Sequence, residues 1–161
     1  MGNNATGQPL NLELLPGHAI RRLHQIAVGI FHQELQEHNL TPVQFAALQT
    51  IANQPGLDQR TLAGLIALDT STTGSLLDRL ETRGLVRRSL SPNDKRVRLL
   101  SLTDAGLALC QTAQPGVQRA QKQILAPLNA TQRKTFMDLL SVLVTENHEF
   151  SRAWNEDSRK G

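Results

Sequence analysis

The hydrophobic periodicity of this 161-residue chain changes once, at Gly84, and that change restricts the fold more than any other feature. Before Gly84, and again after residue 102, apolar residues recur at the three- and four-residue spacing of amphipathic helices. Residues 85–90 and 97–102 instead alternate like strands around the polar turn 91–96. One β-hairpin in a helical chain predicts a mainly α fold of the α+β class, with a protruding tip because the loop exceeds two residues.

Three helix starts are recognisable ahead of the hairpin. Thr41, Pro42 and Gln44 form a capping box with proline at the first helical position. Asp58 caps a second, short helix, and a tight connection then leads to a third helix over residues 70–83. Two short helices followed by a hairpin predict a winged helix-turn-helix, in which the second helix braces the third. The apolar sides predicted to be buried are Phe45, Leu48 and Ile51, then Leu62, Leu65 and Ile66, then Leu76, Leu77 and Leu80.

Helical spacing also marks both flanks of this region. A helix is expected over residues 18–38, a long one from Thr103 to about Leu125, and a last one opened by a capping box at Asn129. Pro115, followed by glycine, predicts a kink or a break in the long helix. We therefore divide the chain into a flexible arm (1–17), helical flanks (18–40 and 103–150), a winged helix-turn-helix lobe (41–102) and a polar tail (151–161).

Positive charge concentrates on the third helix and the hairpin. The whole chain carries a formal charge of +3, whereas segment 79–98, with seven basic and two acidic residues, carries +5. A basic island on a near-neutral chain is typical of a protein that binds a phosphate backbone. A solvated, basic surface hairpin is the alternative interpretation, and charge alone does not decide between the two.

Composition argues against several other kinds of site. Aromatic residues make up 3% of the chain, which disfavours binding of single-stranded nucleic acid by base stacking. The single cysteine, Cys110, allows neither an intrachain disulfide nor a cysteine-rich metal site. Histidines 18, 24, 32 and 38 lack the spacing of a metal-binding motif, so no metal and no cofactor are expected.

The sequence also predicts where the protein works and that it is not an enzyme. No apolar run approaches the ~20 residues of a membrane span, and the first residues lack the apolar stretch of a secretory signal. We therefore expect a cytoplasmic protein without membrane contact. The chain has no glycine-rich phosphate loop, no nucleophile motif and no cluster of carboxylates, which disfavours catalysis.

The helix-turn-helix pattern favours recognition of double-stranded DNA. Short hydroxyl side chains on the third helix reach base edges directly or through water, and a basic hairpin tracks phosphates or enters the minor groove. The alternative is that these hydroxyls only cap the helix and face water. The residues predicted to contact DNA are Thr70, Ser71, Thr72, Thr73, Ser75 and Arg79 on the helix, and Arg87, Lys95, Arg96 and Arg98 on the hairpin.

Two acidic residues are predicted to position the hairpin, which we call the wing. Asp94 lies in its turn, where aspartate commonly stabilises the backbone reversal. Asp78, on the third helix, is a candidate ion-pair partner that would orient Arg96.

Two stretches of the chain resemble the MarR family of bacterial transcriptional regulators. Its reading helix and first wing strand are similar to Leu76-Leu77-Asp78-Arg79-Leu80-Glu81-Thr82-Arg83-Gly84-Leu85-Val86-Arg87-Arg88. Its wing signature, Asp-x-Arg followed by Leu-Thr-x-x-Gly, resembles Ser91-Pro92-Asn93-Asp94-Lys95-Arg96 and Leu100-Ser101-Leu102-Thr103-Asp104-Ala105-Gly106. The order of elements matches from about His18 to about Asn147, so the resemblance covers most of the chain.

The resemblance implies an obligate homodimer, joined through its helical flanks 18–40 and 103–150, that binds pseudo-palindromic duplex DNA. It also implies a repressor that releases DNA when a small molecule, often a phenol or an aromatic acid, binds between the dimer helices and the DNA lobe. By position, that effector pocket would draw on His18, Arg21, Arg22, Gln25, Phe45 and Cys110. The alternative for the charged residues of this set is that they are solvated surface charges.

Two other functions stay open at this point. Cys110 raises the hypothesis of a redox-sensing regulator, although a cysteine on an apolar helix face is more often unreactive. A winged helix also serves some proteins as a protein-interaction module. Such a module would expose apolar anchors, which the hydroxyl-rich third helix lacks.

Overall fold

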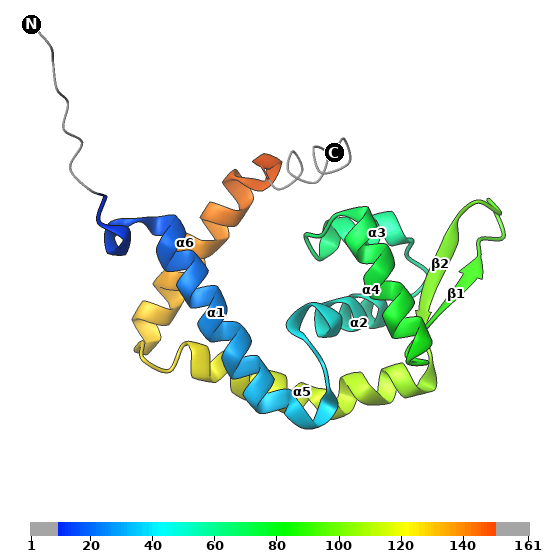
Figure 1. Cartoon of the computed structure of the whole chain (residues 1–161), viewed down its shortest axis with the longest axis horizontal. Coiled ribbons are helices and arrows are strands. Elements are labelled where there is room, and N and C mark those ends of the chain that lie inside the picture. The colour runs from blue at the N-terminus through cyan, green and yellow to red at the C-terminus, as the bar shows by residue number, and fades with distance from the viewer. Residues whose placement is uncertain (1–9, 151–161) are drawn as a thin grey trace, which may run out of the picture.

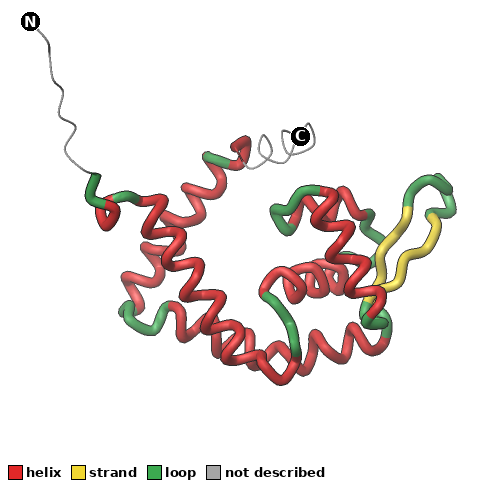
Figure 2. The backbone as a smooth tube through the Cα atoms, in the orientation of Figure 1, coloured by secondary structure: helices red, strands yellow, loops and turns green. Residues whose placement is uncertain are grey.

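The computed structural model describes residues 10–150 and confirms a mainly helical winged-helix fold. Figure 2 shows helices throughout this part of the chain, with one hairpin as its sheet. The elements are η1 (Leu12–Leu14), α1 (Pro16–Leu35), η2 (Gln36–His38), α2 (Pro42–Asn53), α3 (Gln59–Leu65), α4 (Thr70–Thr82), β1 (Val86–Leu90), β2 (Arg98–Leu102), α5 (Asp104–Ile124) and α6 (Ala130–Glu146). In Figure 1, α2, α3, α4 and the hairpin form one lobe, and α5 runs from it to α1 and α6.

Local side-chain caps start the helices of the lobe where the sequence predicts them. The Thr41 hydroxyl accepts the Gln44 amide at 3.2 Å, and the Gln44 side chain accepts the Thr41 amide at 3.1 Å. Asp58 caps α3 through the Thr61 amide at 2.7 Å. These contacts satisfy amide donors that a helix start otherwise leaves unpaired.

A leucine-rich core holds α4 against the rest of the lobe. Leu62, Leu77 and Leu80 are fully buried, and Leu100 from β2 joins them. Burial of each such leucine contributes about 1.5–3 kcal/mol to folding. The prediction that Leu65 braces α4 is wrong, since Leu65 is 53% exposed. The helix ends at this residue and the chain turns away through Ala67, whose φ is 55°, so Leu65 points to solvent.

The long helix α5 continues through Pro115, so the predicted break is absent, and Figure 2 shows α5 bowed along its length. Packing against α1 holds the helix together at this point. A Cβ on Gly116 would lie 2.9 Å from the Glu34 carbonyl oxygen, so the two helices are in close contact there. Arg119 adds an ion pair with Glu34 at 2.7 Å, one turn further along α5.

The N-terminal boundary differs from the prediction. Residues 12–14 form the short helix η1 and α1 already begins at Pro16, so the flexible arm assigned to residues 1–17 is wrong for this part. Proline suits the first turn of a helix because it has no amide hydrogen to leave unpaired there. The remainder of the arm, residues 1–9, and the polar tail 151–161 lie outside the described residues.

The last helix, α6, buries none of its residues. Its capping box at Asn129 forms as predicted, with the Gln132 amide 3.0 Å from the Asn129 side chain. Helix α1 and η1 add further uncovered apolar side chains at the same end of the molecule (Figure 1). The large apolar side chains exposed there are Leu10, Leu12, Leu14, Ile20, Leu23, Ile26, Met137, Leu139, Leu140, Val142, Leu143 and Val144. Among the described residues, no helix has the length and apolar character needed to cross a membrane.

Candidate nucleic-acid interface

The solvent-facing side of α4 carries short hydroxyl side chains. Ser71, Thr72 and Ser75 are exposed, as is Arg79 one turn beyond Ser75, and Thr70 is half-buried. These residues have the hydrogen-bonding groups needed to reach base edges in a major groove. The structure thus presents on one helix most of the residues that the sequence predicted for reading DNA.

Asp69 caps α4 and engages one of these hydroxyls. Its carboxylate accepts the backbone amide of Thr72 at 2.8 Å and also the Thr72 hydroxyl. Hydrogen bonds from the side chain and backbone of Thr72 lower the pKa of Asp69 below its usual value. Thr72 therefore stabilises the helix start, and its exposed side chain is committed to that cap, as the alternative interpretation of the hydroxyls proposed.

The prediction that Thr73 faces DNA is wrong. Its side chain is fully buried, and its hydroxyl donates to the Asp69 carbonyl oxygen at 2.8 Å. A threonine inside a helix commonly satisfies its hydroxyl on the carbonyl four residues earlier, which allows burial. Gly74 also faces the protein, because a Cβ there would lie 3.0 Å from the side-chain nitrogen of Gln59.

The wing is an antiparallel hairpin whose register runs from Val86 opposite Leu102 to Leu90 opposite Arg98. Its turn is held by Asp94, whose carboxylate accepts the Arg96 amide at 2.9 Å. The Asp94 carbonyl oxygen also accepts the Val97 amide at 2.9 Å. The exposed cations of the wing are Arg87, Lys95, Arg96 and Arg98.

The predicted ion pair between Asp78 and Arg96 does not form. Asp78 instead pairs with Arg88, at 2.7 Å, and Arg96 has only a long contact of 3.4 Å with Asp94. The reason is the direction of the hairpin. Its root lies beside α4, while its tip, which carries Arg96, extends away from that helix (Figure 1).

Arg88 fastens the wing to α4 through three acceptors. Its guanidinium donates to Asp78, to Glu81 at 3.1 Å and to the Gly74 carbonyl oxygen at 3.4 Å. Its side chain is 13% exposed, so Arg88 contacts protein although it belongs to the basic segment. This role of Arg88 was not predicted from the sequence. The available signal was the pair of carboxylates three residues apart, which share one face of a helix.

The residues predicted for an effector pocket fall into two groups within one chain, because Phe45 and Cys110 pack in the core while the others lie on the first turns of α1. His18 is half-buried, while Arg21, Arg22 and Gln25 are exposed along the first turns of α1. Phe45 packs near the end of that helix, with its ring centroid 6.3 Å from that of Phe31. At a rise of about 1.5 Å per residue, His18 lies about 20 Å along α1 from Phe31. His18 and Phe45 therefore lie far apart in a single protomer.

Cys110 is buried in the core, 4% exposed. Burial raises the pKa of its thiol above the usual value. Since the thiolate is the reactive form, this environment disfavours reaction with oxidants. The described residues also contain no group of three or more histidine, cysteine, aspartate or glutamate side chains arranged to hold a metal ion.

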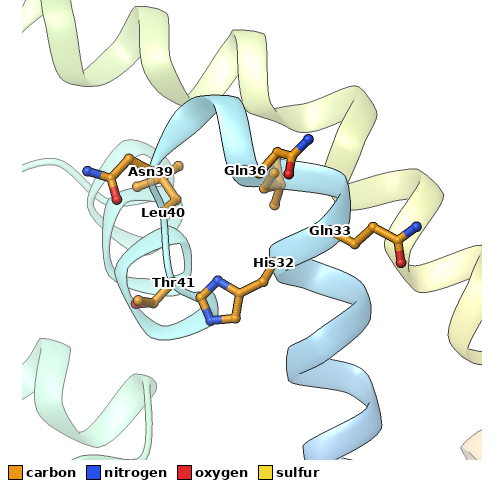
Figure 3. Close-up of a pocket in the computed structure, with 7 residues that line it drawn as sticks. His32, Gln33, Gln36, Asn39, Leu40 and Thr41 are labelled. Carbon is orange, nitrogen blue, oxygen red and sulfur yellow. The ribbon is translucent and has the colours of Figure 1, made fainter.

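A separate pocket of about 480 Å³ lies where α1 joins α2. Figure 3 shows His32, Gln33 and Gln36 from the end of α1 and η2, and Thr41 from the start of α2, around this pocket. Leu35 and Leu40 supply apolar walls. None of the residues predicted for the effector pocket lines this cavity.

Comparisons with known proteins agree with the winged-helix fold. The model of the MarR family matches residues 40–97. The transcriptional repressor NicR of Pseudomonas putida is 30% identical over 80% of this chain and 81% of its own length. The structure of Bordetella bronchiseptica BpsR, whose DNA binding is regulated by 6-hydroxynicotinic acid, is 29% identical, with a TM-score of 0.80 over 84% of this chain and 97% of that one.

A DNA-bound structure is similar as well. A MarR variant from Escherichia coli, complexed with operator DNA, is 28% identical, with a TM-score of 0.79 over 85% of this chain and 99% of that one. The likeness therefore extends across the lobe and the helical flanks. This chain belongs to the MarR family of winged-helix transcriptional regulators.

Proposed function

We propose that this chain is a repressor that binds pseudo-palindromic double-stranded DNA as a homodimer and leaves it when a small aromatic acid binds. One observation carries the DNA-binding part: an exposed hydroxyl face on α4 stands beside a wing whose four cations are also exposed. In this arrangement α4 reads base edges, and the wing supplies phosphate contacts. The similar MarR structure is bound to operator DNA, which supports the proposal.

Arg79→Gln should weaken binding to the preferred site by about 1–3 kcal/mol and relax base preference, because Arg79 extends from the reading face. The site is first selected from a random duplex pool, and affinity is then measured by anisotropy at several salt concentrations. Lys122→Gln, which removes an equal charge from α5, is the matched control. Binding insensitive to salt, or an unchanged preference in Arg79→Gln, would contradict the proposed reading mode.

Arg88 should affect DNA binding without contacting DNA. Arg88→Gln leaves Asp78 and Glu81 uncompensated on the reading helix and releases the wing, so affinity should fall. In an Asp78→Asn, Glu81→Gln background the same substitution should cost less, with a coupling energy of about 0.5–3 kcal/mol. Anisotropy titrations of the four proteins provide the cycle. Equal losses in both backgrounds would show that these contacts do not act on the wing.

The homodimer is proposed from the uncovered apolar surface of η1, α1 and α6. A helix with no buried residue gains little from its own chain, although helices in proteins owe most of their stability to the packing of an apolar face. A contiguous apolar surface of this kind marks a protein interface. A second copy of the chain offers the same surface, as a two-fold symmetric interface requires.

Leu143→Asp should convert the dimer to a monomer, because it places a charge on the uncovered face of α6, where Leu143 is 54% exposed. Sedimentation velocity at matched concentrations measures the change. Leu65→Asp is the control, since Leu65 is exposed to a similar extent on α3, outside the proposed interface. A monomeric wild-type protein, or an unchanged dimer in Leu143→Asp, would refute the assignment.

The effector is proposed to be an aromatic carboxylic acid held at the start of α1. Arg21, Arg22 and Gln25 offer donors suited to a carboxylate, next to the apolar side chains of the proposed dimer contact. His18 stands at the same end of the helix. The regulation of BpsR by 6-hydroxynicotinic acid supports this class of ligand. Phe45 and Cys110, which pack in the lobe, are left out of the proposed contact.

A panel of hydroxylated aromatic acids that includes 6-hydroxynicotinate should contain a ligand that raises Tm and weakens DNA binding. At a hundredfold excess over Kd the stabilisation is about 2.7 kcal/mol. Arg22→Gln should reduce the shift, whereas Lys122→Gln should leave it intact. If no acid in the panel stabilises the protein, or if Arg22→Gln responds like the wild type, the proposed effector class or its site is wrong.

Neither alternative function gains support from a specific contact. The buried Cys110, with its raised thiol pKa, lacks the environment of a redox sensor. The exposed side of α4 presents hydroxyls and an arginine, whereas a protein-docking face requires apolar anchors.

A further inference from the structure

We propose that a cleft between the wing and α3 binds a backbone phosphate of DNA, with Arg60 as a contact outside the predicted interface. This inference rests on the proposed function, because it specifies one more way in which the lobe holds duplex DNA. Arg60 was not among the residues predicted from the sequence, since it precedes the basic segment 79–98.

The cleft has a volume of about 500 Å³ and collects arginines from three separate segments. Arg60 comes from the start of α3, Arg96 from the wing turn and Arg98 from β2. All three are exposed, so their guanidinium groups are accessible to a large partner. The other lining residues are Asp58, Gln59, Thr70 and Val97.

Little within the protein occupies these guanidinium groups. Among the contacts of the described residues, the side chains of Arg60 and Arg98 make no hydrogen bond or ion pair. Arg96 has only its 3.4 Å contact with Asp94, and with 92% of its side chain exposed that pair contributes little. The cations therefore remain available to an external anion.

One carboxylate lies in the same cleft and does not neutralise it. Asp58 accepts the Thr61 amide at 2.7 Å, and hydrogen bonds from Thr61, with a smaller contribution from the nearby positive charge of Arg60, lower the pKa of Asp58. This carboxylate is thus ionised and engaged in capping α3. The three arginines outnumber the two nearby carboxylates, Asp58 in the cleft and Asp94 beside Arg96, so the cleft stays cationic. An oxyanion placed there relieves the repulsion among the guanidinium groups.

The position of the cleft suits a duplex held by α4. Thr70 is the first residue of α4 and lines the cleft, so the cleft borders the reading helix. The side chain of Gln59 donates to the Thr70 carbonyl oxygen at 2.9 Å, which fixes α3 to α4. When α4 lies in the major groove, the DNA strand beside the N-terminus of α4 passes the cleft. The phosphates of that strand carry the negative charge that the arginines would bind.

The exposure of all three arginines favours a phosphodiester of DNA over a small free anion. An enclosed site would desolvate the anion and hold it with buried donors, whereas this cleft opens to solvent along the wing. DNA does not need such an enclosed site, because its dense phosphate charge and the release of its counterions favour binding at an exposed cationic surface. A phosphate contact carries no base preference. Arg60 should therefore contribute affinity alone, whereas Arg79 is proposed to contribute base preference as well.

The test measures binding of a random-sequence 25-base-pair duplex at several salt concentrations. In Arg60→Gln the slope of log Kd against log salt should fall by about 1.8, because the proposed homodimer loses one phosphate contact in each protomer, at about 0.9 per contact. Arg60→Lys, which keeps the charge, should retain the slope, and Lys122→Gln should match the wild type. Binding to the selected site should weaken by the same factor as binding to the random duplex.

Each outcome decides for or against the cleft. If wild-type protein binds DNA and Arg60→Gln keeps its full salt slope, the cleft inference fails and the proposed function stands. If wild-type protein shows no salt-dependent binding, both fail. Stabilisation by inorganic phosphate that is lost in Arg60→Gln, together with an unchanged DNA slope, would assign the cleft to a small anion and overturn the proposal.

Discussion

The close approach of Gly106 to Leu85 is the contact on which the arrangement of the lobe depends. A Cβ at residue 106 would lie 2.0 Å from the Leu85 carbonyl oxygen, so only glycine allows α5 to start there. Thr103 fastens the same junction, because its hydroxyl donates to the Gly84 carbonyl oxygen at 2.6 Å and accepts the Gly106 amide at 3.0 Å. The end of α4, the root of the wing and the start of α5 are thereby joined at one point.

This junction explains how a change at the helical flanks would reach the DNA-reading surface. Helix α5 is continuous from Asp104 to Ile124, and its second close contact, at Gly116, lies against the end of α1. A ligand shifts an equilibrium only as far as it binds the two states differently. Under the proposed function, a ligand that alters how α1 packs on α5 would act on α4 and the wing together, because both are fastened to the start of α5.

The helix caps of this structure were predictable, whereas the errors had two sources, a local pattern misread at Thr73 and an ion pair between segments that the hairpin brings together. Caps such as Thr41 and Asp58 depend on residues within three positions, so composition and spacing suffice. Thr73 was placed outward because of its hydroxyl, although it shares the helical spacing of Leu76 and Leu80 and so belongs to the buried side. The pairing of Asp78 with Arg88 depended on the path of the hairpin, which no short-range pattern specifies.

The same limit applies to the charge count over segment 79–98. That sum treats all seven basic residues alike. Arg88, however, forms ion pairs with Asp78 and Glu81, and Arg83 donates to the Asn39 carbonyl oxygen at 3.0 Å. Arg60 lies outside the segment but shares a cleft with two of its arginines. A cation holds the wing when protein acceptors surround it and remains available to DNA when they do not. The positive surface of this lobe therefore depends on which cations are paired in the folded chain. The summed charge of a sequence segment shows where that surface lies but not which residues form it.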